Sequence, residues 1–313
     1  MDRDSIDWSG SLPAMTTPFD QTGKIDEKAF AASIDRLIEA GADGFVVAGC
    51  TGEFWTLNHE ERARIYDVAV EAVGGRVTVI LGTGAVTVDE TVTLTNMAEK
   101  AGADGVLILP PYFVKLTDDE IFAHYRDVVA RTRMPILLYN IPGNAVNWLT
   151  PALVRRLADL DTVVAVKESS GDWNNFYATL LTAADKIRVF CGPSSIFGAP
   201  AIELGADGFI DCFPNVWAPV GRPLYDAAKN GDKKRAAELQ RVGRLLTDLF
   251  TSEGRTLYPA TKAAMDMMGF PGGGRPRPPL RSMEGPPLEG LRRGLVELGL
   301  LEPDRLKPAR LET

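Results

Sequence analysis

Lys167 stands where a lysine is unusual. It follows Val163, Val164, Ala165 and Val166 in a run that reads as a buried strand, and an ammonium in such surroundings is costly to bury. The ordinary interpretation is a lysine that reaches solvent or pairs with an acid. The alternative is an amine whose pKa is lowered by burial, as a Schiff-base nucleophile requires. Position alone leaves both interpretations open.

Two other segments carry groups that could act with such an amine. Tyr139 lies at the end of the apolar run Ile136–Ile141, and a phenol there could pass protons to or from a substrate. Residues 49–53 read Gly-Cys-Thr-Gly-Glu, a loop whose backbone N–H groups and Thr51 hydroxyl suit a carboxylate. Each has a plain alternative, since Tyr139 could be a packed aromatic residue and the loop an ordinary turn between a strand and a helix.

The elements that would position these groups follow a strand–helix repeat. Gly-Ala-Asp-Gly occurs at 41–44, 102–105 and 205–208, each time after a helical pattern and before an apolar run, as expected for a helix-to-strand turn. Continuously apolar runs indicate strands that are buried on both faces, as in a parallel sheet. Eight such runs separated by amphipathic stretches predict an α/β protein with a (β/α)₈ TIM barrel. The expected strands are Leu12–Phe19, Phe45–Gly49, Val77–Gly82, Val106–Pro110, Ile136–Ile141, Val163–Glu168, Arg188–Gly192 and Phe209–Phe213.

The barrel also explains where the chemistry would lie. Barrel enzymes carry their catalytic groups at the C-terminal ends of the strands, and Lys167, Tyr139 and the 49–53 loop all stand at such ends. The competing architecture is an open doubly wound sheet. No Gly-x-Gly-x-x-Gly loop follows the first expected strand, which disfavours a dinucleotide-binding sheet.

A long tail follows the eighth expected strand. We predict a catalytic barrel domain over 1–230, closed by a helix at Val216–Asn230, and a C-terminal helical extension over 231–313. The segment 271–279 is too rich in proline and glycine to be helical. The extension should therefore contain helices at Lys233–Thr251, Thr256–Met268 and Leu288–Leu300.

Composition narrows the class of protein. Apolar residues make up 45% of the 313 residues, enough for a full core, and no run approaches the roughly 18 apolar residues of a membrane helix. The net charge is −8 with Lys and Arg scattered, so we expect neither nucleic acid nor membrane as a partner. The acidic start resembles no signal peptide, and three cysteines cannot build a disulfide framework, so we expect a cytoplasmic protein.

A metal site is not expected. The two histidines, His59 and His124, both fall in predicted helices, and Cys50, Cys191 and Cys212 lack Cys-x-x-Cys spacing. Zinc sites need such spacing or histidine ligands. The cysteines are better explained as small core residues.

Together the motifs resemble those of the dihydrodipicolinate synthase / N-acetylneuraminate lyase family, the Schiff-base class I pyruvate aldolases. The resemblance covers roughly residues 12 to 300 and implies that Lys167 forms the Schiff base and that Tyr139 shuttles protons. It also implies that Cys50 and Thr51 bind the substrate carboxylate. The segments that carry it are Gly-Cys-Thr-Gly-Glu at 49–53, Pro-Pro-Tyr at 110–112, Tyr-Asn-Ile-Pro at 139–142, Val-Lys-Glu-Ser-Ser-Gly at 166–171, Cys-Gly-Pro at 191–193 and the proline-rich stretch 275–280.

The resemblance has further implications for the site and the assembly. Gly192 and Ile210 stand where family members line the ketoacid pocket with backbone groups. Members need no metal or organic cofactor, and they commonly assemble as homo-oligomers, so we expect a tetramer or dimer. The expected partners are a small 2-keto acid and further copies of the chain.

Three substrate-site positions depart from the dihydrodipicolinate synthases within this family. Cys50 stands where those enzymes have a threonine of a proton relay, and Phe113 stands where the relay has a tyrosine reached across a subunit boundary. Asn144 replaces the arginine that holds the aldehyde substrate's carboxylate, and a neutral amide cannot form a charged bidentate pair. We therefore expect little synthase activity.

The sequence thus predicts a Schiff-base-forming lyase, an aldolase or dehydratase, that acts on a pyruvate-like or 2-keto-3-deoxy acid. Three alternatives stay open. One is dihydrodipicolinate synthase proper (4-hydroxy-tetrahydrodipicolinate synthase), and another is a catalytically silent ketoacid-binding or regulatory protein on the same fold. The third is a phosphosugar enzyme that would use the loop 191–195, although no basic residue adjoins it.

Aromatic residues gather in the expected strand-to-helix loops. Trp55, Trp148, Trp173 and Trp217 all fall in these loops. They could hold an apolar part of the substrate or fill contacts between subunits, where aromatic residues are enriched. The sequence leaves both open.

Overall fold

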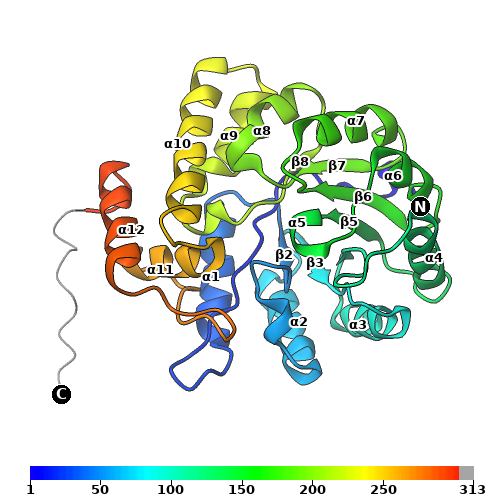
Figure 1. Cartoon of the computed structure of the whole chain (residues 1–313), viewed down its shortest axis with the longest axis horizontal. Helices are drawn as coiled ribbons and strands as arrows, with labels where there is room; N and C mark the ends of the chain where they lie inside the picture. Colours follow the sequence, from blue (N-terminus) through cyan, green and yellow to red (C-terminus); the bar gives the residue numbers. More distant parts are fainter. Residues whose placement is uncertain (303–313) are drawn as a thin grey trace.

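Eight parallel strands form a nearly closed barrel inside a layer of helices (Figure 1), in a computed structural model that describes residues 1–302. The sheet order runs β1-β8-β7-β6-β5-β4-β3-β2, and an isolated bridge between Ala14 and Val46 joins the segment after β1 to β2. The predicted TIM barrel is therefore confirmed. Its strands are β1 (Gly10–Ser11), β2 (Gly44–Val47), β3 (Thr78–Gly82), β4 (Gly105–Ile108), β5 (Ile136–Asn140), β6 (Val163–Glu168), β7 (Arg188–Cys191) and β8 (Gly208–Phe209).

Helices follow the strands and cover the outside of the barrel. Several begin at capping side chains, and Asn58, Thr87 and Thr117 each accept a backbone N–H from the first turn of their helix. The helices are α1 (Glu27–Glu39), α2 (His59–Val73), α3 (Val88–Ala101), α4 (Asp118–Val129), α5 (Pro142–Ala145), α6 (Pro151–Leu157), α7 (Trp173–Ala183), α8 (Ser194–Glu203), α9 (Arg222–Lys229), α10 (Lys233–Thr251), α11 (Leu257–Met268) and α12 (Gly285–Glu297).

The strands separate two apolar clusters, because alternate side chains of a strand point to opposite faces. One cluster fills the inside of the barrel and the other lies between the strands and the helices. Tyr139 belongs to the inner cluster. Other inner side chains are Val46, Ile80, Leu107, Leu137 and Phe190, and their outward neighbours are Val47, Leu81, Ile108, Leu138 and Val189.

The repeated Gly-Ala-Asp-Gly phrase has a structural role. The first glycine of each copy has a positive φ, which glycine adopts at no steric cost at the end of a helix. The aspartates Asp43, Asp104 and Asp207 each accept a backbone N–H from the preceding strand, at N···O distances of 2.8, 2.7 and 2.9 Å. Each copy thus turns the chain and also ties the strand it begins to the strand before it.

The bounds expected for the first strand were wrong. The regular strand is Gly10–Ser11 and not Leu12–Phe19. Pro13 has no N–H to donate, and the chain beyond it pairs only at isolated points, such as the Ala14 N–H that donates to the Asp211 carbonyl at 2.9 Å. The segment Leu12–Phe19 is therefore mostly apolar, as expected of a strand, but its backbone is irregular.

The expected eighth strand, Phe209–Phe213, also ends early, at Phe209. The Asp211 carboxylate accepts the Cys212 backbone N–H at 2.6 Å, so that N–H is not free for a strand ladder. The chain then enters a 3₁₀ turn at Phe213–Asn215. Similarly, the helix expected at Val216–Asn230 is a 3₁₀ turn at Ala218–Val220 followed by α9.

The C-terminal helices pack onto the barrel. Helix α10 contacts α8 and α9, α11 contacts α10, and α12 packs against α11 at the edge of the molecule (Figure 1). The predicted helices are present, although the last spans Gly285–Glu297 and not Leu288–Leu300. Phe250, Met265 and Leu291 belong to the same core as the barrel. The division at residue 230 stays a prediction, and 303–313 lie outside the described residues.

Within 1–302, none of the helices combines the length and apolar character needed to cross a membrane. The segment 271–279 contains no helix, as predicted from its proline and glycine content. Both histidines lie in helices, His59 in α2 and His124 in α4.

Candidate active site

Lys167 and Tyr139 lie side by side at the ends of two neighbouring strands. They are direct partners in the register of β5 and β6, so both side chains point to the same face of the sheet. The Lys167 Nζ atom lies 4.2 Å from the centre of the Tyr139 ring. Both side chains are buried. The structure therefore places an amine and a phenol in contact inside the barrel mouth.

Burial changes the acid–base behaviour of this lysine. The pKa of Lys167 is lowered because its ammonium loses hydration inside the protein. The acidic groups of Cys50, Asp211 and Cys212 raise the pKa of Lys167, but by less than burial lowers it. The amine is therefore deprotonated at lower pH than a free lysine, which favours nucleophilic attack.

The two side chains share one cavity of about 200 Å³ at the C-terminal ends of the strands. The predicted substrate-binding residues Cys50, Thr51, Gly192 and Ile210 also line it. The structure thus gathers six of the eight predicted site residues around one space. The other walls include Ser169, Ser195, Asp211, Cys212, Thr247, Thr251, Leu257 and Tyr258.

Glu168 anchors the end of β6 on the opposite face. Its carboxylate is buried and accepts hydrogen bonds from the Asn140 and Asn175 side chains at 2.9 and 3.2 Å, and from the Ser170 N–H at 3.0 Å. Because neighbouring residues of a strand alternate in direction, a Glu168 fixed toward α7 directs Lys167 into the barrel.

The loop after β2 is a tight turn in which glycine is required. A Cβ atom at Gly52 would lie 3.1 Å from the Ala48 Cα and 3.2 Å from the Met15 carbonyl oxygen. The Thr17 hydroxyl donates to the Gly52 carbonyl at 2.8 Å. The close packing fixes the backbone next to Thr51, which lines the cavity.

A buried ion pair fixes the far end of this loop. The Glu53 side chain is fully buried and pairs with Lys262 of α11, which is also buried. Glu53 also accepts the Arg277 backbone N–H at 2.8 Å. Contacts from the C-terminal extension therefore fix the position of the loop that carries Cys50 and Thr51.

Tyr139, Cys50 and Tyr258 bring three polar groups to the same cavity. Cys50 is near enough to both phenols to raise the pKa of Tyr139 and of Tyr258. The Asn144 side chain donates to the Tyr258 hydroxyl at 3.3 Å. Burial raises the pKa of both tyrosines, so both phenols stay protonated at neutral pH.

Asp211 and Tyr258 are among the wall residues that sequence reasoning missed. Asp211 could have been found, because it is the one charged residue in the apolar run expected as the eighth strand, and the rule that singled out Lys167 applies to such residues. It accepts hydrogen bonds from the Ser194 hydroxyl and the Ser195 N–H, both at 3.0 Å. Tyr258 carries no comparable signal, since it lies in a helix of the tail and reaches the cavity only through tertiary packing.

The other two predicted site residues lie outside the cavity walls. Asn144, in α5, touches the site through Tyr258. Phe113 is 89% exposed and has a φ of 74°, a left-handed conformation that is uncommon for an aromatic residue. Phe113 is not among the described residues that line the cavity.

The loop tryptophans do not line the cavity in the described part of the chain. Trp55 packs against Phe54 and Tyr258, with ring centroids 5.5 and 5.8 Å apart. Trp173 packs against Phe176 and Phe197 in a separate cluster. Trp55 and Trp173 thus belong to two separate aromatic clusters.

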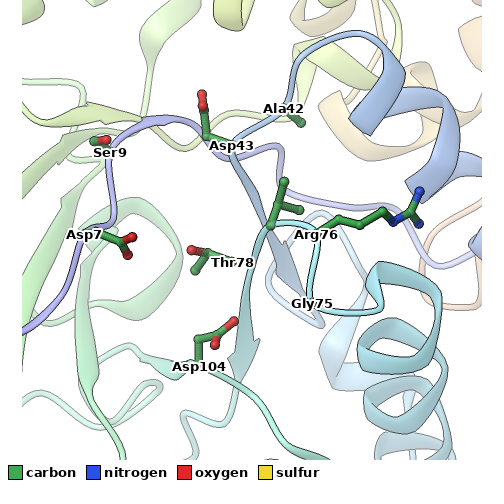
Figure 2. A pocket seen from close by; sticks show the side chains of 9 residues that line it. Asp7, Ser9, Ala42, Asp43, Gly75, Arg76, Thr78 and Asp104 are labelled. Atoms are coloured by element: carbon green, nitrogen blue, oxygen red, sulfur yellow. The ribbon is translucent and has the colours of Figure 1, made fainter.

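A second hollow, of about 500 Å³, lies at the opposite end of the barrel (Figure 2). Asp43 and Asp104 line it, but both carboxylates hold backbone N–H groups of the neighbouring strands. Arg76 points toward the surrounding helices in Figure 2 and pairs with Asp35. Over residues 1–302 we find no cluster of His, Cys, Asp and Glu suited to a metal ion, and all three cysteines are free and buried.

The chain is similar in sequence to known proteins over most of its length. A model of the dihydrodipicolinate synthetase family matches residues 7–295. The 4-hydroxy-tetrahydrodipicolinate synthase of Methanopyrus kandleri is 35% identical over 295 residues, which cover 93% of this chain and 97% of that protein. The synthase of Thermodesulfovibrio yellowstonii is 35% identical over 262 residues, covering 84% and 89%.

Solved structures are similar over the same length. Dihydrodipicolinate synthase from Thermotoga maritima has a TM-score of 0.88 at 30% identity, covering 95% of this chain and 100% of that one. YagE from Escherichia coli, a prophage protein of the dihydrodipicolinic acid synthase family solved in complex with pyruvate, has a TM-score of 0.88 at 30% identity, covering 94% and 99%. The similarity therefore includes both the barrel and the helices that follow it.

Proposed function

Because the chain belongs to the dihydrodipicolinate synthetase family and is a Schiff-base (class I) lyase, we propose that it acts on a pyruvate-like 2-keto acid through Lys167 and Tyr139. The observation that carries the proposal is the buried amine of Lys167, held against the Tyr139 ring at 4.2 Å in a cavity with Thr51. The pyruvate bound to YagE supports this class of substrate.

The proposed reaction needs only groups of this chain and the substrate. The Lys167 nitrogen attacks the keto carbon, the former carbonyl oxygen takes up protons and leaves as water, and a C=N⁺ iminium remains. The C3–H or C3–C4 bond then breaks, and its electron pair forms the C2=C3 bond of an enamine as the iminium π electrons return to nitrogen. Tyr139 transfers the protons, and Thr51 with nearby backbone N–H groups holds the carboxylate.

The charges around the cavity favour a substrate whose distal part is uncharged. Among the described wall residues, Lys167 is the one cation, and Asp211 adds a carboxylate. A second anionic group on the substrate would be repelled by Asp211 and would find no guanidinium to pair with. The hydroxyl groups of Ser195, Thr247 and Thr251 suit a neutral hydroxylated chain. We therefore propose a 2-keto-3-deoxy acid, cleaved or dehydrated through its enamine.

A second candidate is dihydrodipicolinate synthase itself. It is favoured by the names of the similar curated proteins, which are 4-hydroxy-tetrahydrodipicolinate synthases at 32 to 36% identity. Cys50, Phe113 and Asn144 count against it, because they stand where the resemblance places the synthase's relay and carboxylate-binding groups. The two candidates share the same Schiff base, but the synthase condenses pyruvate with a second substrate, whereas the lyase cleaves or dehydrates a single one.

The Schiff base is tested by trapping it. Pyruvate with borohydride should leave a reduced adduct on the protein, and peptide mapping should place it on Lys167 and not on the buried Lys262. Lys167→Ala should abolish the adduct while the protein remains folded by circular dichroism. The proposal would be contradicted if saturating pyruvate left the protein unlabelled, or if the adduct lay on another lysine.

The substrate class is tested with two assays in parallel. One follows pyruvate release from a panel of neutral 2-keto-3-deoxy acids, and the other follows condensation of pyruvate with aspartate semialdehyde. We expect turnover in the first and almost none in the second. Turnover of aspartate semialdehyde at an ordinary enzymatic rate of about 1 s⁻¹ or more would establish the synthase in its place.

A further inference from the structure

Tyr258 has no role in the reaction as described so far, yet it lies in the same cavity. It comes from α11, in the C-terminal extension, and lines the cavity with Lys167, Tyr139 and Cys50. It also packs against the cluster inside the barrel that contains Tyr139 and Cys50. A hydroxyl group is therefore delivered to the active site by a part of the chain outside the barrel.

The surroundings of Tyr258 suit proton transfer. Cys50 lines the cavity together with Tyr139 and Tyr258, and it is near enough to both phenols to raise the pKa of each. The Asn144 Nδ2 donates to Tyr258 at 3.3 Å, which leaves the phenol proton of Tyr258 free for another acceptor. Tyr139 and Cys50 are buried, whereas Tyr258 is partly exposed. Of the three side chains, Tyr258 is therefore the one with access to solvent, while Tyr139 contacts the buried amine.

We propose that Tyr258, Cys50 and Tyr139 form a proton relay, contained within one chain, between the reacting carbon and water at the cavity mouth. The inference rests on the proposed function, since the relay serves the enamine formed on Lys167. Tyr258 supplies a hydroxyl at the outer end of this relay, where Phe113 cannot.

The relay keeps atoms and charge in balance. When the iminium loses a C3 proton, Tyr139 takes it up and passes its own proton to the Cys50 sulfur. Cys50 passes its thiol proton to Tyr258, and Tyr258 gives its phenol proton to water. The C3–H electron pair becomes the C2=C3 bond, so each of the three side chains ends neutral. Protonation of the enamine runs the same steps in reverse.

The test uses pyruvate alone, so it does not depend on knowing the second substrate. In D₂O, each cycle of enamine formation and protonation exchanges a methyl proton of pyruvate for deuterium, which proton NMR follows as loss of the methyl signal. We expect Tyr258→Phe to slow this exchange about tenfold or more, since general acid–base groups contribute factors of about 10²–10⁴. The pyruvate concentration at half-maximal rate should stay the same, and borohydride should still label Lys167.

Variants of Cys50 test the relay further. Cys50→Ala should slow exchange as Tyr258→Phe does, because either change interrupts the same relay. Cys50→Ser should retain most of the rate, since a hydroxyl both donates and accepts. The double variant Tyr258→Phe with Cys50→Ala should be no slower than the slower single variant. Trp55→Phe is the packing control, because Trp55 contacts the Tyr258 ring without offering a group to the relay.

Specific outcomes would overturn the relay. Exchange at the wild-type rate in Tyr258→Phe would remove Tyr258 from the reaction. A Tyr258→Phe variant that loses the Lys167 adduct as well as exchange would show that the residue only supports the shape of the site, and so would an equal loss in Trp55→Phe. A wild-type protein that neither exchanges protons nor forms the adduct would overturn the proposed function together with the relay.

Discussion

The amine of Lys167 is held in surroundings that disfavour its charge, and this affects stability as well as chemistry. Its pKa is lower in the folded protein than the 10.5 of a free lysine, so the unfolded chain binds its proton more readily. Stability therefore rises as pH increases from the lowered pKa toward 10.5, and the cost of burying the charge is greatest below that range.

Replacement of the amine should remove this dependence on pH. We expect Lys167→Met to melt at a higher temperature than the wild type near neutral pH, with a difference that shrinks as pH approaches about 10. Thermal unfolding measured across this range by circular dichroism checks the prediction. A difference that stays constant with pH would show that packing, and not the charge, separates the two proteins.

Tyr139 and Lys167 should be separable by substitution. Tyr139→Phe keeps the ring that packs against the amine but removes the hydroxyl. We expect it to retain the borohydride adduct on Lys167, formed more slowly, and to lower kcat about 10²-fold or more because the proton carrier is lost. Rapid-quench labelling and steady-state kinetics give the two rates. A variant with unchanged kcat would assign proton transfer to another group.

Whether a residue of the site could be predicted from the sequence depends on whether it belongs to a strand or to a helix that packs against the barrel. Lys167 and Tyr139 end apolar strands, so strand order and the geometry of a barrel bring them together. Asp211 follows the same rule and could have been found. Tyr258 could not, because its place in the cavity depends on how α11 packs against the barrel, which no local pattern encodes.

At the scale of elements, the buried pair of Glu53 and Lys262 joins α11 to the loop after β2. Lys262→Met would leave the Glu53 carboxylate buried without its cation, so we expect a loss of about 3–5 kcal/mol in the free energy of unfolding. The double variant Lys262→Met with Glu53→Gln should recover part of that loss. Chemical denaturation of the single and double variants checks both values.

An exposed ion pair offers a matched control for this prediction. Arg64 pairs with Glu27 at 2.7 Å, with both side chains substantially exposed, so Arg64→Met should cost no more than about 1 kcal/mol. Equal losses for Arg64→Met and Lys262→Met would contradict the view that burial makes the second pair important. Lys262→Met should also raise the pyruvate concentration needed for half-maximal labelling, because Thr51 lies on the loop that the pair holds.

The bounds of elements were harder to predict than their order. Eight strands and their intervening helices follow from apolar periodicity, but β1 and β8 are shorter than their apolar runs. In β1 the proline Pro13 interrupts the ladder, and after β8 the Asp211 side chain replaces strand partners for the Cys212 N–H. Apolar character shows that a segment is buried; it does not show which backbone N–H groups are paired.

At the scale of the whole molecule, apolar side chains remain exposed on the loops after β4 and β5. Phe113 is 89% exposed, and Val114, Val146 and Trp148 are also exposed. The Asn147 side chain joins these loops through the Pro111 and Val114 carbonyls, at 2.6 and 2.8 Å. Exposed apolar side chains on a structured surface are typical of an interface, which agrees with the homo-oligomer expected from the sequence.

Self-association should depend on this surface. We expect sedimentation velocity to show a dimer or tetramer and Phe113→Asp to shift it toward smaller species, because an ionised carboxylate is costly to bury at an interface. Leu181→Asp, which changes an exposed leucine of α7, is the matched control and should leave the assembly unchanged. A wild-type protein that sediments as a monomer would contradict the prediction.

The aspartates of the repeated Gly-Ala-Asp-Gly phrase have a consequence for the order in which the barrel assembles. Their hydrogen bonds to the preceding strands join residues only 32, 25 and 18 positions apart, so each closes within a single strand–helix–strand unit. Short chain separations cost little loop-closure entropy, and contacts of this kind favour rapid folding. By contrast, the contact of β1 with β8 joins the two ends of the barrel. The aspartate hydrogen bonds can therefore form before the circle closes, so that folding joins units whose strands are already aligned.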